Sequence, residues 1–346
     1  RSHPSSGYPR PVLLPRPRTI ALAPVVSVGA SRPVRLTALA TVIAALASAC
    51  SVPGGAPGSP GGPTGARTAT GVGAATANPP ATSGRSGTTA PATTPTTTPT
   101  PKESTAGHCA RTLVGGMSAS ERAGQLLVVG LDVNAPRESL DDLVRDRHLG
   151  GVILLGGWFR GTDPIRATTK HLNSLVDGSR SPGLLLAADQ EGGNVQQLRG
   201  DGFTRLPTGL AQGTLARDAL TRRAASWAEE LRAVGINVNL APVADTVPAG
   251  IGRDNDPIGQ WDRQFSSDPA VVSRAVGAFI EGMHRGGVAA TIKHFPGIGR
   301  ITGNTDLTAD GIVDRTTTAT DPYLRPFATG IADGADLVMV GSAIYS

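Results

Sequence analysis

The sequence predicts an α/β fold in which parallel strands alternate with helices. Six short apolar runs recur between residues 107 and 346, and all but the run at 236–240 lack alternation with polar residues. Strands of this kind are buried on both faces, and the helical stretches between them are typical of parallel β/α units. Six such strands fit either an α/β barrel or a doubly wound sheet. The first run is not followed by a Gly-x-Gly-x-x-Gly turn, which disfavours a dinucleotide-binding sheet.

The predicted strands are separated by recognisable helix signals. Ser118 and Glu121 form a capping-box pattern that opens a helix leading into the first strand. Two longer helical stretches, 217–234 and 269–285, separate later strands. The six predicted strands cover residues 125–129, 151–155, 184–188, 236–240, 288–292 and 337–340.

Composition divides the chain into three predicted parts. Residues 1–50 end in the run LASAC (46–50), which resembles the lipobox of bacterial lipoproteins, so we predict an export signal and lipidation of Cys50. Residues 51–106 hold 10 Pro, 10 Gly and 14 Thr and are predicted to be a disordered tether. Residues 107–346 are long enough for one hydrophobic core. The lipobox predicts an exported protein on the outer face of the cell membrane; an ordinary secretory signal or a hydrophobic anchor is the alternative.

The net charge of +5 arises in the amino-terminal part of the chain. Residues 1–106 hold nine Lys or Arg and one acid, whereas residues 107–346 hold 23 basic and 26 acidic residues. Aromatic residues make up only 3% of the sequence. The predicted folded part therefore has neither the basic stripe nor the stacking aromatics of a nucleic-acid binder.

Polar motifs follow three successive predicted strands. These motifs are DQEGG (189–193), APVAD (241–245) and KHFPG (293–297). The carboxyl ends of barrel strands are where barrel enzymes place their active sites. A single charged residue there is usually a helix cap or part of a solvated loop, but an acid, an acid and a Lys-His pair after three strands favour a functional site. We predict no metal and no cofactor in it.

The chain also resembles a known family over about residues 117–346. The segments that carry this resemblance are LLLAADQEGGNVQQLR (184–199), GFTRLP (202–207), INVNLAPVAD (236–245), DPIGQWDRQFSSDP (256–269) and TIKHFPGIGR (291–300). They resemble the NagZ-type β-N-acetylglucosaminidases of glycoside hydrolase family 3. The resemblance implies a (β/α)8 barrel of the TIM type, here truncated after the sixth strand. It also implies removal of terminal β-linked N-acetylglucosamine with retention, through a covalent glycosyl-enzyme.

The resemblance assigns roles to four residues. It implies that Asp189 accepts hydrogen bonds from the hydroxyls of the terminal sugar, and that Arg263, Lys293 and His294 donate to sugar oxygens. The alternatives are a buried salt bridge for Arg263 and a satisfied core imidazole for His294. Gln197 stands where the family commonly carries an Arg, so no substrate contact is predicted for it.

The acid/base and the nucleophile depart from the family pattern. The loop after the fifth strand typically reads Asp-Ser-His, whereas residues 304–306 read Asn-Thr-Asp, so Asp306 is the predicted acid/base. A carboxyl in this role needs its pKa raised by burial or by a neighbouring charge, and a turn or a helix cap is the alternative. The family's nucleophile, an Asp after the seventh strand, has no match up to Ser346. A retaining hydrolase requires two groups at the scissile bond, so these residues alone are predicted to be inactive.

The function expected from these features is that of an exported, lipid-anchored hydrolase. In complete form it would trim N-acetylglucosamine from cell-wall muropeptides or related glycans. The predicted partners are therefore a carbohydrate substrate and the membrane. A non-catalytic sugar-binding lipoprotein and a β-glucosidase of the same superfamily are the alternatives.

Overall fold

The computed structural model describes residues 105–178, 181–308 and 311–346. The predicted export signal with Cys50, and nearly all of the predicted tether, lie outside these described residues. Among the residues that the structure does describe, no helix has the length and apolar character needed to cross a bilayer.

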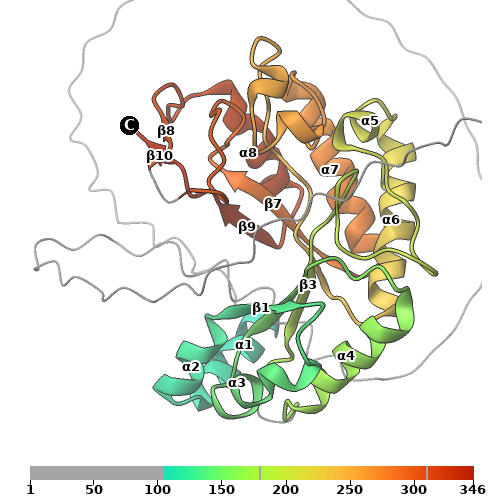
Figure 1. The fold of residues 1–346 in the computed structure, drawn as a ribbon. Helices are drawn as coiled ribbons and strands as arrows, with labels where there is room; N and C mark the ends of the chain where they lie inside the picture. The colour runs from blue at the N-terminus through green and yellow to red at the C-terminus, as the bar shows by residue number, and fades with distance from the viewer. Residues whose placement is uncertain (1–104, 179–180, 309–310) are drawn as a thin grey trace, which may run out of the picture. The chain divides into compact units, whose positions relative to one another are not determined.

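One parallel sheet organises the described part of the chain. Its six strands follow each other in the order β1-β2-β3-β6-β7-β9 and curl into a half-barrel (Figure 1). Their bounds are Val128–Asp132, Gly151–Leu155, Leu185–Ala188, Val238–Asn239, Ala289–Phe295 and Leu337–Val340. Spatial order equals chain order, so the sheet has no point at which the order reverses, as a doubly wound sheet has. The predicted barrel-type α/β arrangement is confirmed.

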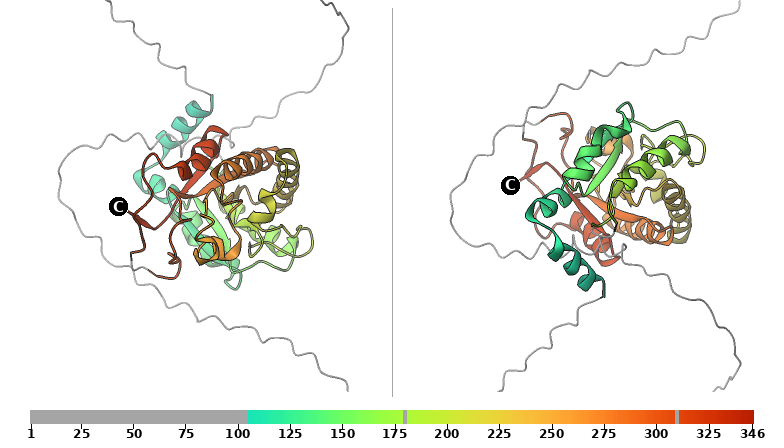
Figure 2. Two further views of the ribbon diagram at one scale, coloured as in Figure 1. Left: turned by 90° about the horizontal axis from the view of Figure 1, so that it is seen from above. Right: turned by 90° about the horizontal axis from the view of Figure 1, so that it is seen from below.

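Helices connect the strands and cover the outside of the curl (Figure 2). They are α1 (Thr105–Gly116), α2 (Ala119–Gln125), α3 (Asp141–Asp146), α4 (Thr162–Ser174), α5 (Gly209–Gly213), α6 (Arg217–Ala233), α7 (Pro269–Arg285) and α8 (Arg325–Ala332). Short 3₁₀ helices span Arg137–Leu140, Gly252–Asp254, Gly259–Trp261 and Pro322–Leu324. Two small sheets complete the description: antiparallel β4 (Gln190–Gly192) with β5 (Val195–Gln196), and parallel β8 (Val313–Asp314) with β10 (Ile344–Tyr345).

The predicted first strand is displaced by three residues. The capping box at Ser118 and Glu121 is confirmed, and it starts a helix that runs through Gln125. Leu126 and Leu127 then close a further turn by donating their N–H groups to Ala123 and Gly124. The strand therefore begins only at Val128, because the helical hydrogen bonds occupy the residues that the apolar run assigned to the strand.

The strands that carry the polar motifs differ in length from the prediction. β6 is reduced to Val238–Asn239. The side chain of the preceding Asn237 instead bridges β3, accepting from the Leu186 N–H and donating to the Leu184 carbonyl, each at 2.8 Å. β7 extends as far as Phe295, so that Lys293 and His294 lie within the strand rather than after it.

Helices α6 and α7 pack against each other through small residues. A Cβ added at Gly282 would lie 2.4 Å from the Ala224 Cβ, and one added at Gly286 would lie 2.4 Å from the Ala228 Cβ. The backbones can therefore approach only because neither glycine has a side chain. The core beneath them contains Trp227 and Phe279, which are nearly inaccessible to solvent.

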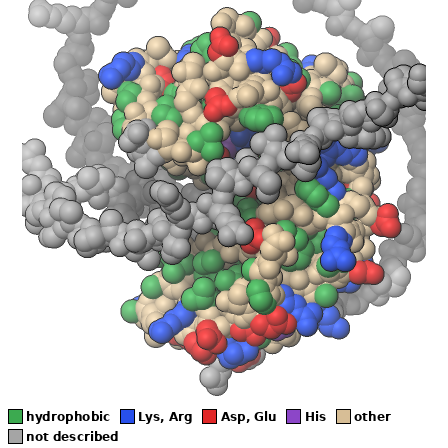
Figure 3. Space-filling view, viewed as in Figure 1, with side chains coloured by type: hydrophobic (Ala, Val, Ile, Leu, Met, Phe, Trp, Pro, Cys, Tyr) green, Lys and Arg blue, Asp and Glu red, His purple; other side chains and the backbone are tan. Residues whose placement is uncertain are grey.

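The two edge strands leave apolar side chains exposed. Around the start of β1, Leu126 is 74% and Leu127 58% exposed, and Val340 at the end of β9 is 70% exposed. In the view of Figure 3, which is that of Figure 1, hydrophobic side chains gather in the lower half of the molecule, where β1 and its neighbouring helices lie. In the described residues β1 pairs only with β2, and β9 pairs only with β7.

Candidate active site

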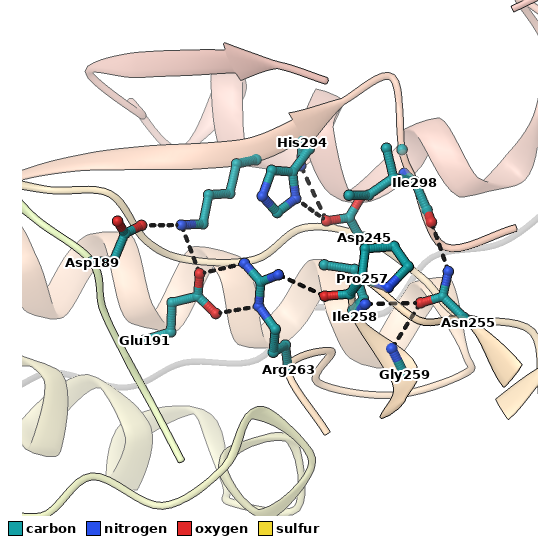
Figure 4. Close-up of polar contacts among 12 residues, drawn as sticks. Asp189, Glu191, Asp245, Asn255, Pro257, Ile258, Gly259, Arg263, His294 and Ile298 are labelled. Carbon is teal, nitrogen blue, oxygen red and sulfur yellow. Dashed lines mark hydrogen bonds and ion pairs between the residues drawn. The ribbon is translucent and has the colours of Figure 1, made fainter. Parts of the chain in front are cut away.

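Charged side chains from three strands meet at the carboxyl ends of β3, β6 and β7 (Figure 4). Asp189 directly follows β3, and Glu191 lies in the hairpin strand β4. Lys293 and His294 lie near the carboxyl end of β7, and Asp245 lies in the segment after β6. Adjacent parallel strands end at one edge of a sheet, which is why residues far apart in sequence converge here.

Lys293 is the buried centre of this cluster. Its side chain is 2% exposed, and its Nζ lies 2.5 Å from Asp189 Oδ1 and 2.6 Å from Glu191 Oε1. The Asp189 side chain is 21% exposed and is therefore the outermost member. Its Oδ2 has no hydrogen-bond partner among the described residues and is available to a ligand hydroxyl.

Arg263 is held by the second carboxylate. Its Nε and Nη2 each donate to Glu191 at 2.8 Å in a bidentate pair, and its Nη1 donates to the Pro257 carbonyl at 2.6 Å. The buried salt bridge, which was the alternative reading for Arg263, is thus present. A guanidinium has five N–H donors, so two remain for a ligand.

Burial and charge act in opposite directions on these groups. Burial by itself would raise the pKa of Glu191, but the charges of Arg263 and Lys293 outweigh it and lower the pKa to about 2. Burial would lower the pKa of Lys293, and the charges of Asp189 and Glu191 raise it above its ordinary value. Glu191 and Lys293 are therefore charged at neutral pH, in a cluster that contains two carboxyl groups and two basic groups.

His294 forms a second unit with Asp245. The His294 Nδ1 lies 2.7 Å from Asp245 Oδ2, and Asp245 also accepts the backbone N–H groups of His294 at 3.1 Å and Ile298 at 2.8 Å. Both Asp245 oxygens already accept backbone hydrogen bonds, so we assign the proton of this contact to Nδ1. The Nε2 atom is then the one that can face a ligand.

Asn255 supports the segment that follows β7. Its side chain donates to the carbonyls of Ile298 and Ile301 and accepts the N–H groups of Ile258 and Gly259 (Figure 4). The amide is fully buried. It therefore links the loop that carries Arg263 to the loop that follows His294.

Asp306 lies outside the cluster. Its side chain is exposed, and its backbone N–H donates to the Asn304 Oδ1 at 3.0 Å, as in an Asx turn. No hydrogen bond or ion pair in the described ranges joins its carboxylate to Asp189, Lys293 or His294. The structure thus unites four predicted residues, together with Glu191 and Asp245, and leaves Asp306 apart.

Sequence reasoning assigned no role to Glu191 and Asp245. Both lie inside the motifs that follow β3 and β6. Each is the acid that neutralises or orients a side chain predicted to bind the sugar. The signal was the concentration of acids after two successive strands. Within the described residues, no group of three or more His, Cys, Asp or Glu side chains is arranged to hold a metal ion.

Comparison with known proteins agrees with the resemblance found in the sequence. Residues 118–346 match the family model for the glycosyl hydrolase family 3 N terminal domain. A beta-hexosaminidase of Xylella fastidiosa (strain M23) is 36% identical over 229 residues, which cover 64% of each chain. The chain therefore spans less than two thirds of the length of this curated relative.

Solved structures show the same relationship. A beta-N-acetylhexosaminidase from Beutenbergia cavernae DSM 12333 has a TM-score of 0.64 and 44% identity, over 66% of this chain and 69% of that one. NagZ from Neisseria gonorrhoeae, in complex with N-trifluoroacetyl-D-glucosamine, has a TM-score of 0.53 and 28% identity, over 63% and 64% of the two chains. M tuberculosis LpqI has a TM-score of 0.54 and 28% identity, over 66% and 63%.

Proposed function

Since the chain belongs to glycoside hydrolase family 3, with beta-hexosaminidases among its relatives, we propose that it forms the sugar-binding part of a β-N-acetylglucosaminidase. In this proposal the whole protein removes terminal β-linked N-acetylglucosamine from cell-wall muropeptides or related glycans. The ligand in the Neisseria gonorrhoeae structure, an N-acylated glucosamine, supports this choice of sugar.

The proposal rests on one observation: Asp189 is partly exposed, whereas the charged side chains beneath it are buried. Lys293 is 2% exposed and also pairs with the buried Glu191, so it holds the Asp189 carboxylate at Oδ1, while the Asp189 side chain remains 21% exposed. A fixed carboxylate can accept hydrogen bonds from two sugar hydroxyls without losing side-chain entropy. The free N–H groups of Arg263 and the Nε2 of His294 would then contact further sugar oxygens.

The proposed chemistry is hydrolysis with retention. It requires a nucleophile and an acid/base on opposite sides of the scissile bond. Asp189, Glu191 and Asp245 are each already paired with a basic side chain, so the proposal assigns the nucleophile to none of them. It keeps Asp306 as the acid/base, because the loop after β7 begins beside His294 and brings a carboxyl to this side of the barrel.

A second candidate function is sugar binding without catalysis. The exposed Asx turn at Asp306 favours it, because no hydrogen bond or ion pair among the described residues joins this carboxyl to the charged cluster. A β-glucosidase would differ only in the sugar that it accepts.

One experiment separates these functions. The protein expressed from its whole gene is assayed with a chromogenic β-N-acetylglucosaminide and the matching β-glucoside. Turnover of the first alone supports the proposal, and faster turnover of the second indicates a glucosidase. Binding of N-acetylglucosamine without turnover of either glycoside indicates a sugar-binding protein.

The proposal also includes export and a lipid anchor at Cys50. Its support is the lipobox-like run at residues 46–50, since a bacterial lipoprotein carries more than one acyl chain and so binds a membrane stably. Cys50→Ala is expected to move the protein from the detergent phase to the aqueous phase. Unchanged partitioning would refute the anchor.

A further inference from the structure

A second surface adjoins the charged cluster at the ends of β2 and β3. The carbonyl of Asp189 accepts the N–H of Gln197 at 3.0 Å, and the carbonyl of Gln197 accepts the N–H of Trp158 at 2.8 Å. The Arg199 N–H returns to the Trp158 carbonyl at 3.1 Å. The loop after β2 is thereby attached, residue by residue, to the segment that starts at Asp189.

An aromatic ring and a guanidinium meet on this surface. The guanidinium carbon of Arg199 lies 4.5 Å from the ring centroid of Phe159, whose side chain is 51% exposed. The ring itself is backed by Gly157, where an added Cβ would lie 2.6 Å from the ring. Both groups are therefore held in place while one part of the ring stays open to solvent.

The charge of Arg199 is not neutralised. Its Nε donates to the Gln196 carbonyl at 2.8 Å and its Nη2 to the Asn194 carbonyl at 3.1 Å, which leaves both N–H groups of Nη1 unused in the described contacts. No carboxylate pairs with it there. By contrast, Arg217, Arg253 and Arg285 each have an acidic partner.

A second unpaired guanidinium lies beside it. Arg205 is exposed, contacts only the Gln196 Oε1 at 3.5 Å, and forms no ion pair with any described residue. Burial, and then the charge of Arg205, lower the pKa of Arg199. This surface thus carries two guanidinium groups without a carboxylate partner among the described residues, whereas Arg263 and Lys293 of the neighbouring cluster are both paired with carboxylates.

We propose that Phe159 and Arg199 form a binding subsite for a carboxylate-bearing group that is joined to the sugar held at Asp189. The inference rests on the proposed function for the identity of that sugar. A guanidinium offers parallel N–H donors that match the two oxygens of a carboxylate, and the Phe159 ring offers an apolar face to the carbon skeleton that carries it. Gln197 takes no part, because its side-chain oxygen accepts the Gly157 N–H at 3.0 Å.

The test compares three N-acetylglucosaminides with the same aromatic leaving group, which is neutral or carries a carboxylate or a phosphate. The whole-gene protein and its Arg199→Gln, Arg199→Lys and Phe159→Leu variants are assayed for kcat/KM. Arg285→Gln is the matched control, because Arg285 is an exposed arginine at the end of α7, just before β7 begins at the opposite end of the barrel.

Arg199→Gln is expected to lower kcat/KM about tenfold for the carboxylate substrate and to leave the neutral substrate within about twofold. For Arg199→Lys, kcat/KM on the carboxylate substrate should lie between the values of wild type and Arg199→Gln, because lysine keeps the charge and loses the parallel donors. Phe159→Leu should cost about two- to fivefold on the carboxylate substrate, through the loss of the cation–π contact that positions Arg199.

Several outcomes would overturn the subsite. Equal losses on the neutral and the carboxylate substrate would make Arg199 structural, and a preference for phosphate would replace the proposed ligand class. If the wild-type protein turns over none of the three glycosides, the proposed function fails. Titration of the three uncleaved glycosides against wild type and Arg199→Gln then decides the subsite by whether Arg199 selectively strengthens binding of the carboxylate form.

Discussion

The charged cluster at the ends of β3 and β7 and the loop that follows β7 hold the two parts of the proposed chemistry, and they are built in opposite ways. In the cluster, Lys293 is 2% exposed and contacts two carboxylates at 2.5 and 2.6 Å. In the loop, Asp306 is exposed and, among the described residues, hydrogen-bonded only to Asn304, and its neighbour Leu307 is 80% exposed. Binding groups are thus fixed by buried partners, whereas the proposed proton donor has only a local turn.

This difference separates the groups that are fixed to bind the sugar from the group proposed to donate a proton. A buried ion pair holds its side chains in one geometry before any ligand arrives, because breaking it leaves an uncompensated charge. A turn stabilised by one exposed hydrogen bond can be rearranged at little cost. Substitutions should therefore affect the stability of the fold in the first region and, in the second, only the step that the loop serves.

The largest effect is expected from Glu191→Gln. The change leaves Lys293 with one carboxylate and Arg263 with none, and removing one partner of a buried pair costs about 3–5 kcal/mol of unfolding free energy. Urea unfolding measures it. A second change, Lys293→Met, in the same chain should restore part of the loss because it removes one stranded cation. A loss under about 1 kcal/mol would show that water screens the cluster.

The stability of the cluster should depend on acid pH. The pKa of Glu191 is lowered to about 2 in the native state from an ordinary value of 4.5, so its contribution is complete above pH 4.5 and lost as the pH falls towards 2. The integrated loss is about 3 kcal/mol. The difference in unfolding free energy between wild type and Glu191→Gln, followed from pH 6 to pH 2, should shrink accordingly. A constant difference would contradict the lowered pKa.

The next effect concerns the exposed edge of the cluster. Asp189→Ala in the whole-gene protein should lower kcat/KM by a factor that corresponds to about 2–3 kcal/mol, because charge-assisted hydrogen bonds to the sugar are lost. Binding of N-acetylglucosamine, measured by calorimetry, should weaken in parallel. If kcat alone changes and binding is retained, Asp189 acts in the reaction step instead.

The smallest effect on stability is expected from Asp306→Ala, within about 0.5 kcal/mol, because the side chain is exposed. Its effect on activity should depend on the leaving group, severe for a sugar alcohol and mild for a nitrophenolate that departs without a proton. Equal impairment with both leaving groups would exclude Asp306 as the acid/base and leave it only a structural role in the turn.

The sequence predicted the periodic parts of this molecule well. The strands at 151–155 and 337–340 and the helix at 269–285 have the predicted bounds, because uninterrupted apolar runs and capping residues leave local patterns. The first strand was misplaced because its apolar residues also fit the last turn of α2, and local hydrophobicity cannot decide between the two.

The sequence by itself determined which polar residues stand at the ends of β3, β6 and β7, since strand spacing is a local property. Only the tertiary structure decided how they pair: Lys293 with an acid 104 positions away, Arg263 with one 72 positions away, and His294 with Asp245 rather than with a carboxylate of the other group. The same holds for the unpaired charge of Arg199 beside Phe159. The energy of an ion pair depends on the distance between the charges and on their burial, and neither is set until the strands have curled together.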